Sequence, residues 1–342
     1  MKKKILVTGG TGYIGSHTTV ELIKEGFDVA IIDNLHNSDA EVADRIKMIT
    51  GIKPALEVFD LCDFDRLDGF FKKHNDISSV IHFAAFKAVG ESVKKPLEYY
   101  RNNIVSLINL LDGMKRYGIA DFVFSSSCTV YGQPKKLPVN EQSPMQPATS
   151  PYGNTKQIGE AIIRDTTNSD KNIRAISLRY FNPIGAHPSA LIGELPRGVP
   201  ENLVPFITQT AIGLRDELKV FGNDYNTPDG SCIRDYLHVV DLARAHVVAV
   251  KRLLEKKNRA DYEVFNLGTG KGVSVLEAIA SFERVTGIKL NYRITDRRPG
   301  DIEKIWADPS LANKELGWRT QSSLDEAMKT AWEWEKRIHK TK

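Results

Sequence analysis

The sequence is poor in cysteine and has none of the cysteine spacings that mark metal or disulfide sites. The 342 residues include only three cysteines, Cys62, Cys128 and Cys232, which lie far apart along the chain. Structural zinc sites and disulfide-rich domains need cysteines in close pairs or in larger numbers. We therefore expect no metal ion, no disulfide framework and reduced thiols in a cytoplasmic protein.

Long apolar runs and long basic runs are also missing. No stretch supplies the roughly 20 consecutive apolar residues that a membrane-spanning helix needs. The 47 basic residues are scattered among 43 acidic ones, for a net charge of +4, with no tract typical of nucleic-acid binding. At the N-terminus only Ile5, Leu6 and Val7 follow the first lysines before a glycine-rich turn, which is too short for a signal peptide. We expect no nucleic-acid partner and no membrane partner.

The first half of the chain alternates short apolar runs with amphipathic segments. This alternation predicts an α/β fold with a Rossmann-type, doubly wound parallel sheet. Strands are expected at Lys4–Thr8, Val29–Ile32, Leu56–Phe59, Val80–Phe83, Asp121–Ser125 and Ala175–Arg179. Helices are expected at His17–Gly26, Ala40–Thr50, Leu67–Lys73, Tyr99–Tyr117 and Tyr152–Thr167.

The pattern changes after Phe181, where proline and glycine become frequent. The later segments are shorter and mixed, which predicts a smaller C-terminal α+β domain for the substrate. We expect a dinucleotide-binding domain at 1–181 and a substrate domain at 182–342, with segments near 236–262 as candidates for packing back on the first domain. Elements are expected at Leu218–Phe221, Val239–Leu254, Val264–Leu267, Val275–Val285, Leu290–Ile294 and Leu324–Arg337.

A glycine-rich turn, VTGGTGYIGSH, follows the first predicted strand and opens the first predicted helix. Gly10, Gly12 and Gly15 fit G-x-G-x-x-G, and Gly9 offers an alternative first glycine. Such glycines let the backbone approach a pyrophosphate at a helix N-terminus. Asp33 ends the next strand, eighteen residues after Gly15. A carboxylate there binds ribose hydroxyls and repels a 2′-phosphate, so NAD is favoured over NADP.

The segment SPYGNTK places Tyr152 and Lys156 four residues apart, just after Pro151. Residues at this spacing share one face of a helix, and proline suits the first helical turn. A nearby ammonium, or an oxidised nicotinamide, favours the phenolate and lowers the pKa of a tyrosine. The resulting phenolate can take a proton from a sugar hydroxyl.

A run of hydroxyl residues ends the fifth predicted strand, where open α/β sheets bind ligands. Within Ser125-Ser126-Ser127-Cys128-Thr129, either Ser127 or Thr129 could bond a substrate oxygen. The alternative for any one of these residues is a helix cap or a serine turn.

The chain resembles the extended short-chain dehydrogenase/reductase superfamily and, within it, the UDP-glucose 4-epimerase family. The resemblance covers nearly the whole chain. It rests on the segments VTGGTGYIGSHT, HFAAFKAVGES, FSSSCTVYG, SPYGNTK, LRYFNPIGAHPS and RDYLHVVDLA. Of these, KAVGESV and FNPIGAHPSALIGE are more particular to the epimerases.

This resemblance implies roles at matching positions. Tyr152 would be the catalytic base and acid, Lys156 would lower its pKa and hold the nicotinamide ribose, and Ser127 would bond the hexose O4 with Thr129 near it. The implied NAD site comprises Gly9, Gly12, Tyr13, Ile14, Gly15, Asp33, Asn34, Leu35, His36, Asn37, Ser38, Asp60, Leu61, Phe83, Ala84, Ala85, Lys87, Asn102, Ser127, Tyr152, Lys156 and Phe181. The implied UDP-sugar site comprises Lys87, Ser127, Tyr152, Asn182, Asn202, Leu203, Phe221, Arg234, Tyr236, Arg298, Asp301 and Ile305.

The implied activity interconverts UDP-glucose and UDP-galactose. NAD, tightly bound, would oxidise C4, the 4-keto sugar would rotate, and the hydride would return to the other face. A homodimer through the helix at Tyr99–Tyr117 is expected, with a role in galactose or polysaccharide metabolism. Ile305, just before Trp306, has a size that leaves open a side activity on UDP-N-acetylhexosamines.

Three other functions stay open at this point. One is an epimerase of another UDP-sugar, and a second is a dinucleotide-sensing protein without catalysis. A third is a sugar-nucleotide 4,6-dehydratase, which would need an acid pair where this chain has Cys128 and Thr129.

Overall fold

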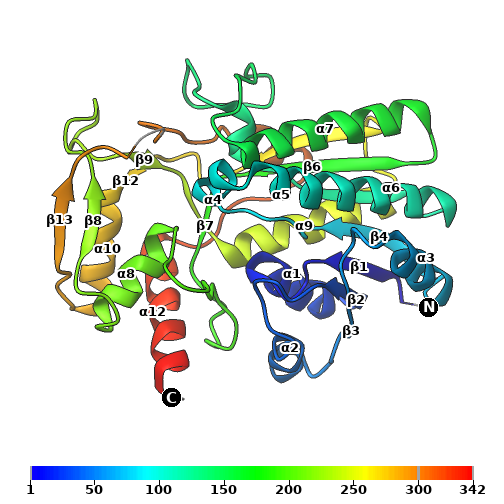
Figure 1. Cartoon of the computed structure of the whole chain (residues 1–342), viewed down its shortest axis with the longest axis horizontal. Helices are drawn as coiled ribbons and strands as arrows, with labels where there is room; N and C mark the ends of the chain where they lie inside the picture. Colours follow the sequence, from blue (N-terminus) through cyan, green and yellow to red (C-terminus); the bar gives the residue numbers. More distant parts are fainter. Residues whose placement is uncertain (1, 299–300, 341–342) are drawn as a thin grey trace.

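Residues 2–298 and 301–340, which the computed structural model describes, are built around a seven-stranded sheet (Figure 1). The strand order is β3-β2-β1-β4-β5-β6-β11, and every neighbouring pair is parallel. The predicted doubly wound parallel sheet is therefore confirmed. Its strands are β1 (Lys4–Thr8), β2 (Asp28–Asp33), β3 (Ala55–Val58), β4 (Ile77–His82), β5 (Asp121–Ser125), β6 (Arg174–Tyr180) and β11 (Tyr262–Leu267).

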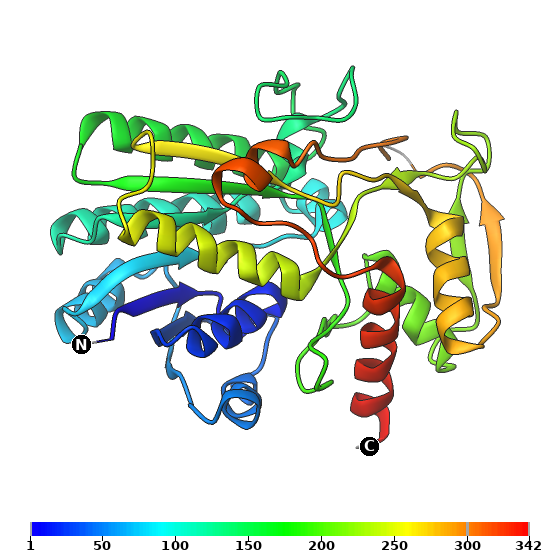
Figure 2. The same cartoon turned by 180° about the vertical axis from the view of Figure 1, so that it is seen from behind.

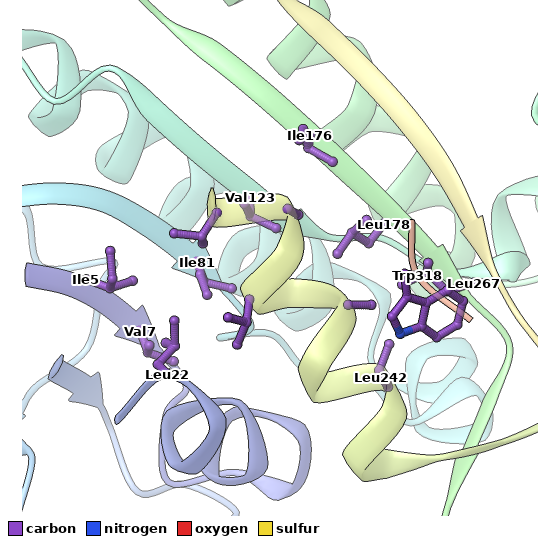
Figure 3. Packing of buried hydrophobic residues seen from close by; sticks show 14 of the residues in the cluster. Ile5, Val7, Leu22, Ile81, Val123, Ile176, Leu178, Leu242, Leu267 and Trp318 are labelled. Carbon is purple, nitrogen blue, oxygen red and sulfur yellow. The ribbon is translucent and has the colours of Figure 1, made fainter. Parts of the chain in front are cut away.

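Helices cover both faces of the sheet because its strands are apolar on both faces. Ile5 and Val7 of β1 point into the same core as the buried side chains of helices α1 and α9, as Figure 3 shows, whereas Leu6 points into the opposite core. The layer helices are α1 (Tyr13–Lys24), α2 (Val42–Thr50) and α9 (Val239–Leu254) on one face, and α3 (Phe64–Lys73), α6 (Ser106–Arg116) and α7 (Pro151–Ser169) on the other.

Two elements from the later part of the sequence belong to this layered core. Helix α9 packs beside α1, and β11 extends the sheet next to β6, as Figure 2 shows from behind. The chain thus returns to the sheet after it has left it at β6. A division near residue 181 into two domains stays a prediction.

The remaining elements form a second, smaller core around helix α12. It combines short strand pairs with three helices, and its buried apolar residues form a cluster of their own. The elements of this part are β7 (Asn182–Ile184), α8 (Leu203–Ala211), β8 (Leu218–Phe221), β9 (Ile233–Arg234), β10 (Tyr236–His238), β12 (Val273–Ser274), α10 (Val275–Thr286), β13 (Tyr292–Thr295) and α12 (Leu324–Lys340). Helix α11 (Ser310–Glu315) instead packs on β11, and its Ala312 belongs to the core of the large sheet.

The predicted long helix at Tyr99–Tyr117 is present as one unbroken helical stretch from Pro96 to Arg116, made of α5 (Pro96–Tyr100), a π-helical turn at Arg101–Val105 and α6. The π-helical turn was not predicted, and a short helix, α4 (Val89–Lys94), precedes this stretch. Within the turn, Asn103 is buried and bonds the backbone of Phe86 through both its oxygen and its nitrogen. A π-turn inserts an extra residue into a helix and often occurs near functional sites. No helix in the described part of the chain is long and apolar enough to span a membrane.

Candidate active site

The glycine turn after β1 forms an open cradle at the start of α1. Gly9 has φ of +71°, and a Cβ there would lie 2.7 Å from the backbone nitrogen of Ala84. A Cβ on Gly15 would lie 2.2 Å from the carbonyl oxygen of Gly9. No side chain caps the helix at Gly12, so the first N–H groups of α1 remain available to an anion.

Asp33 lies at the end of β2, next to this cradle. Its buried carboxylate accepts hydrogen bonds from the backbone N–H of Thr11 at 3.1 Å and of Leu35 at 2.9 Å, and from the hydroxyl of Ser38 at 3.1 Å. These bonds fix the carboxylate between the glycine turn and the loop after β2. The donor set fits a dinucleotide, because a helix N-terminus suits the pyrophosphate and a fixed carboxylate suits ribose hydroxyls.

The first turns of α7 bring Tyr152 and Lys156 together, as their spacing predicted. Ser150 caps this helix by accepting a hydrogen bond from Gly153, and Pro151 occupies its first turn. The Lys156 ammonium lies 5.9 Å from the centre of the Tyr152 ring and donates to the carbonyl of Ser125 at 2.6 Å. Both side chains are buried. Helix α7 is thereby attached directly to the end of β5.

For both residues, burial has a larger effect on the pKa than the interaction between the two side chains has. Burial raises the pKa of Tyr152 well above its usual value, and the neighbouring Ser127 hydroxyl opposes that rise. Burial also lowers the pKa of Lys156 to about 8. The expected lowering of the tyrosine pKa by the lysine is therefore not present in the protein alone, because each charged form has lost its water.

The hydroxyl run after β5 supplies both a cap and a free hydroxyl. Ser127 accepts a hydrogen bond at 3.2 Å from Thr129 N–H and caps the short helical turn Cys128–Tyr131, and its hydroxyl also lies beside the Tyr152 phenol. Within the described chain, the buried Thr129 hydroxyl has no hydrogen-bond partner. A buried polar atom without a partner is costly, so a ligand oxygen beside it would be stabilising.

A buried ion pair lies beneath these residues, and sequence reasoning missed it. Glu160 is fully buried and accepts from Ser126 at 2.6 Å and from Arg179 at 2.6 and 2.9 Å. Arg179 also donates to the Tyr131 hydroxyl at 3.0 Å. The available signal was position, because Glu160 follows Lys156 by four residues on the same helix.

Four of the predicted nucleotide-binding residues gather in the smaller part of the molecule. Asp301 accepts from Arg234 at 2.6 Å and from Arg298 at 3.5 Å. The Arg298 guanidinium lies 5.6 Å from the centre of the half-exposed Phe221 ring. An aromatic face and two arginines thus lie together, as a base and a diphosphate would require.

The other predicted residues are distributed along the carboxyl edge of the sheet or beside it. The residues that directly follow β1 to β4 and β6 are Tyr13, Ile14, Asn34, His36, Asn37, Asp60, Leu61, Phe83, Ala84, Ala85, Lys87, Phe181 and Asn182. Asn102 lies in the π-helical turn. Buried Ile305 packs in one cluster with Phe181 and Val130, whereas Leu203 and Tyr236 pack into the core of the smaller part.

A further acidic residue joins two of the predicted ligand-binding residues. Glu194 accepts a hydrogen bond from Asn202 at 2.6 Å and pairs with Lys87 at 3.1 Å. Lys87 follows β4, and Asn202 precedes α8, so the carboxylate bridges the two parts of the molecule. Nothing in the local sequence around Glu194 indicated this contact.

The comparisons with known proteins identify the family over nearly the whole chain. The family model for GDP-mannose 4,6 dehydratase matches residues 6–331. The chain is 50% identical over 331 residues to the UDP-glucose 4-epimerase of Bacillus subtilis (strain 168), covering 97% of this chain and 96% of the relative.

Solved structures agree as well. A UDP-glucose 4-epimerase from Stenotrophomonas maltophila, with bound NAD and formylated UDP-arabinopyranose, is 46% identical with a TM-score of 0.96, covering 99% of this chain and all of its own. The Bifidobacterium longum enzyme, in complex with NAD+ and UDP, is 44% identical with a TM-score of 0.93 and 98% coverage of both chains.

The full-length relatives decide between the two kinds of enzyme that these names describe. The full-length relatives and structures are epimerases. The chain belongs to the UDP-glucose 4-epimerase family of the extended short-chain dehydrogenase/reductase superfamily.

Proposed function

We propose that the protein interconverts UDP-glucose and UDP-galactose with a tightly bound NAD. The observation that carries this proposal is that Ser127 lies beside the Tyr152 phenol, while the nearby Thr129 hydroxyl, buried against the first turn of α7, has no partner among the described residues. When bound, NAD supplies the acceptor and donor of the hydride at C4 of the hexose. The residues of this chain position the sugar and move the proton at its O4.

Gly9, Gly12 and Gly15, with Asp33, are proposed to hold the dinucleotide. The cradle leaves no room for a side chain at Gly9 or Gly15 and presents unpaired N–H groups to the pyrophosphate. Asp33 has its oxygens fixed by backbone groups, in position for the adenosine ribose. We propose that residues 1–181, with α9 and β11, form the cofactor domain and that the remaining elements form the substrate domain.

Tyr152 is proposed to take the proton from O4 and to return it at the end of the reaction. In the protein alone its pKa is raised by burial, so it keeps its proton near neutral pH. A positive charge next to the phenol favours the phenolate, and Lys156, with a pKa of about 8, is largely charged at pH 7. Ser127 lies beside the phenol and would orient the O4 hydroxyl.

The nucleotide part is proposed to stay anchored while the hexose turns. Arg234 and Arg298 would bind the diphosphate, and Phe221 would stack on the uracil. Asp301 holds both guanidinium groups in place. Asn182, Asn202, Leu203 and Tyr236 would complete this wall. Fixing UDP and releasing the sugar lets one base, Tyr152, serve both faces of C4.

The direct test is to incubate the purified protein with UDP-galactose, without adding NAD, and to follow UDP-glucose with a coupled dehydrogenase. Product formation would support both 4-epimerisation and a cofactor that travels with the protein. Product formation only after NAD is added would support epimerisation with a weakly held cofactor. No product under either condition would contradict the proposal and favour a non-catalytic dinucleotide-sensing protein.

Ile305 keeps a wider substrate range open. Its buried side chain packs with Phe181, which follows β6, and with Val130, which follows Ser127 and Thr129. We propose that it lines the hexose pocket. Turnover of UDP-GlcNAc in the same assay would support this wider range, and its complete absence would restrict the enzyme to UDP-glucose and UDP-galactose.

A homodimer is proposed through helices α4 to α6. Three large apolar side chains on this surface, Val93, Leu97 and Ile108, are 62%, 75% and 47% exposed. Exposed apolar groups on neighbouring elements mark contact surfaces. Light scattering should give twice the chain mass, and Leu97→Glu should reduce it toward the monomer; a monomeric wild type would contradict this proposal.

A further inference from the structure

Residues 185–201, which we call the strap, cross the carboxyl edge of the sheet. At one end the Tyr13 hydroxyl, at the start of α1, donates to the carbonyl of Gly185 at 2.6 Å. Near the other end Arg197 donates to the carbonyl oxygens of His36 at 3.1 Å and Ser38 at 2.5 Å. Between them, Glu194 pairs with Lys87 in the loop after β4. The strap therefore contacts the loops that follow β1, β2 and β4.

The middle of the strap is also attached to helix α12. The Trp334 indole N–H donates to the carbonyl of Glu194 at 2.8 Å, and a Cβ on Gly193 would lie 2.5 Å from the Trp334 ring. The Arg45 guanidinium of α2 lies 5.7 Å from the same ring. Figure 1 shows this segment as the green loop below β7, between α2 and α12, and Figure 2 shows the same arrangement from behind.

The path of the strap coincides with the path expected for a dinucleotide. In this fold the adenosine half lies over the loops after β1 to β3 and the nicotinamide half over those after β4 and beyond, across the point where the strand order reverses. Arg197 bonds the loop beside the adenosine half, and Glu194 bonds the loop beside the nicotinamide half. A ligand beneath the strap could leave only after these contacts had opened.

We propose that the strap retains the dinucleotide and that Arg197 and Glu194 are positioning residues that set how slowly it leaves. This inference rests on the proposed function, because it presumes that the cradle holds NAD. Arg197 acts through two backbone carbonyls and does not depend on a partner's charge. Glu194 acts through the Lys87 ammonium, in the loop after β4, and through the Asn202 amide, just before α8.

The test measures release of NAD in the absence of substrate. Wild type and variants are loaded with NAD, freed of excess by rapid gel filtration and mixed with an NAD glycohydrolase that destroys released cofactor. Protein-bound NAD is then measured over time. Arg197→Ala should release NAD about tenfold faster, as expected for the loss of two hydrogen bonds. Glu194→Gln keeps a partner for Asn202 but loses the charge that attracts Lys87, and should release it about twofold to threefold faster.

The matched control is Arg293→Ala on β13. Arg293 is an exposed arginine that donates to Glu217 at 2.8 Å. The Arg293→Ala variant should release NAD at the same rate as the wild type. If NAD binds in a titration but Arg197→Ala, Glu194→Gln and wild type release it at one rate, the strap proposal is wrong and the proposed function stands. If the wild type binds no NAD in the titration, the proposed function fails and the strap proposal fails with it.

Discussion

The two halves of the candidate site are held in different ways. The catalytic corner, which we define as Tyr152, Lys156, Glu160 and Arg179, lies on α7 and β6 and is almost entirely buried. The nucleotide cleft, defined as Phe221, Arg234, Arg298 and Asp301, lies at the ends of short strands and in loops, and the Arg298 side chain is 54% exposed. Both halves carry charged groups: those of the corner are removed from water, whereas in the cleft the Arg234 and Asp301 side chains are 15% and 10% exposed and Arg298 stays open to solvent.

This difference follows from what each half must do. A proton transfer needs groups fixed by neighbours that do not move, and burial also strengthens every charge in the corner. A cleft that must admit and release a charged nucleotide gains from an arginine such as Arg298, which remains hydrated until the ligand arrives. We therefore expect changes in the corner to reduce kcat or stability, and changes in the cleft to raise KM.

The largest effect should come from Tyr152→Phe. This change removes the phenolic oxygen from the corner and leaves the buried ring, so the fold should persist. We expect kcat to fall about 1,000-fold with little change in KM, because general acid–base groups contribute about 100-fold to 10,000-fold. Tyr117→Phe is the matched control, since it removes a hydroxyl that bonds only Asp68 outside the site. Near-normal turnover by Tyr152→Phe would remove this tyrosine from the mechanism.

Glu160→Gln tests whether the corner depends on its buried ion pair. The substitution leaves Arg179, which is 5% exposed as a side chain, without a counter-charge. Breaking such a pair costs about 3–5 kcal/mol, which a urea titration would detect. The control Glu217→Gln breaks an exposed pair with Arg293 and should cost less than about 1 kcal/mol. Equal losses for the two variants would contradict the contrast between buried and exposed pairs.

The sequence predicted those parts of the site in which the functional residues lie close together along the chain. The glycine turn, Asp33 and the Tyr152–Lys156 pair each carry their spacing within one strand, turn or helix, and the structure places them on the expected elements. The apolar strands also predicted a parallel sheet. Their order could not be predicted in the same way, because the apolar runs of the central strands β1, β4 and β5 resemble one another and carry no signal of which strand pairs with which.

The missed features depend on contacts between distant segments. Glu160 reaches Arg179 across two elements, and Glu194 reaches Lys87 across 107 residues. The pKa of Tyr152 was misjudged for the same reason, since burial, which only the fold determines, outweighs the effect of Lys156. The spacing of residues in the sequence indicates which side chains can react together, whereas tertiary packing sets the protonation state of each side chain.

Arg234→Ala should affect the nucleotide cleft without disturbing the corner. Its guanidinium is the closest one to Asp301, and we propose that it binds the diphosphate. Hydrogen bonds to charged groups contribute about 1.5–3 kcal/mol, so KM for UDP-galactose should rise about 10-fold to 150-fold. Steady-state kinetics should show kcat within about threefold of the wild type. A fall in kcat with an unchanged KM would assign Arg234 to the chemistry and erase the contrast between the two halves.

The smallest effect concerns a buried histidine behind the catalytic corner. His246 packs against Phe83 and Tyr180, and burial lowers its pKa to about 4. Between pH 6.5 and about 4 the unfolded chain binds this proton and the folded chain does not, so stability is lost as the pH falls through that range. From the two pKa values the loss at pH 5 is about 2 kcal/mol. His246→Phe keeps an apolar ring there and should show a correspondingly smaller loss between pH 7 and pH 5 in urea titrations. If His246→Phe and the wild type showed the same pH dependence, the His246 ring would be accessible to water. The region shielded from water would then include only the residues that contact Tyr152.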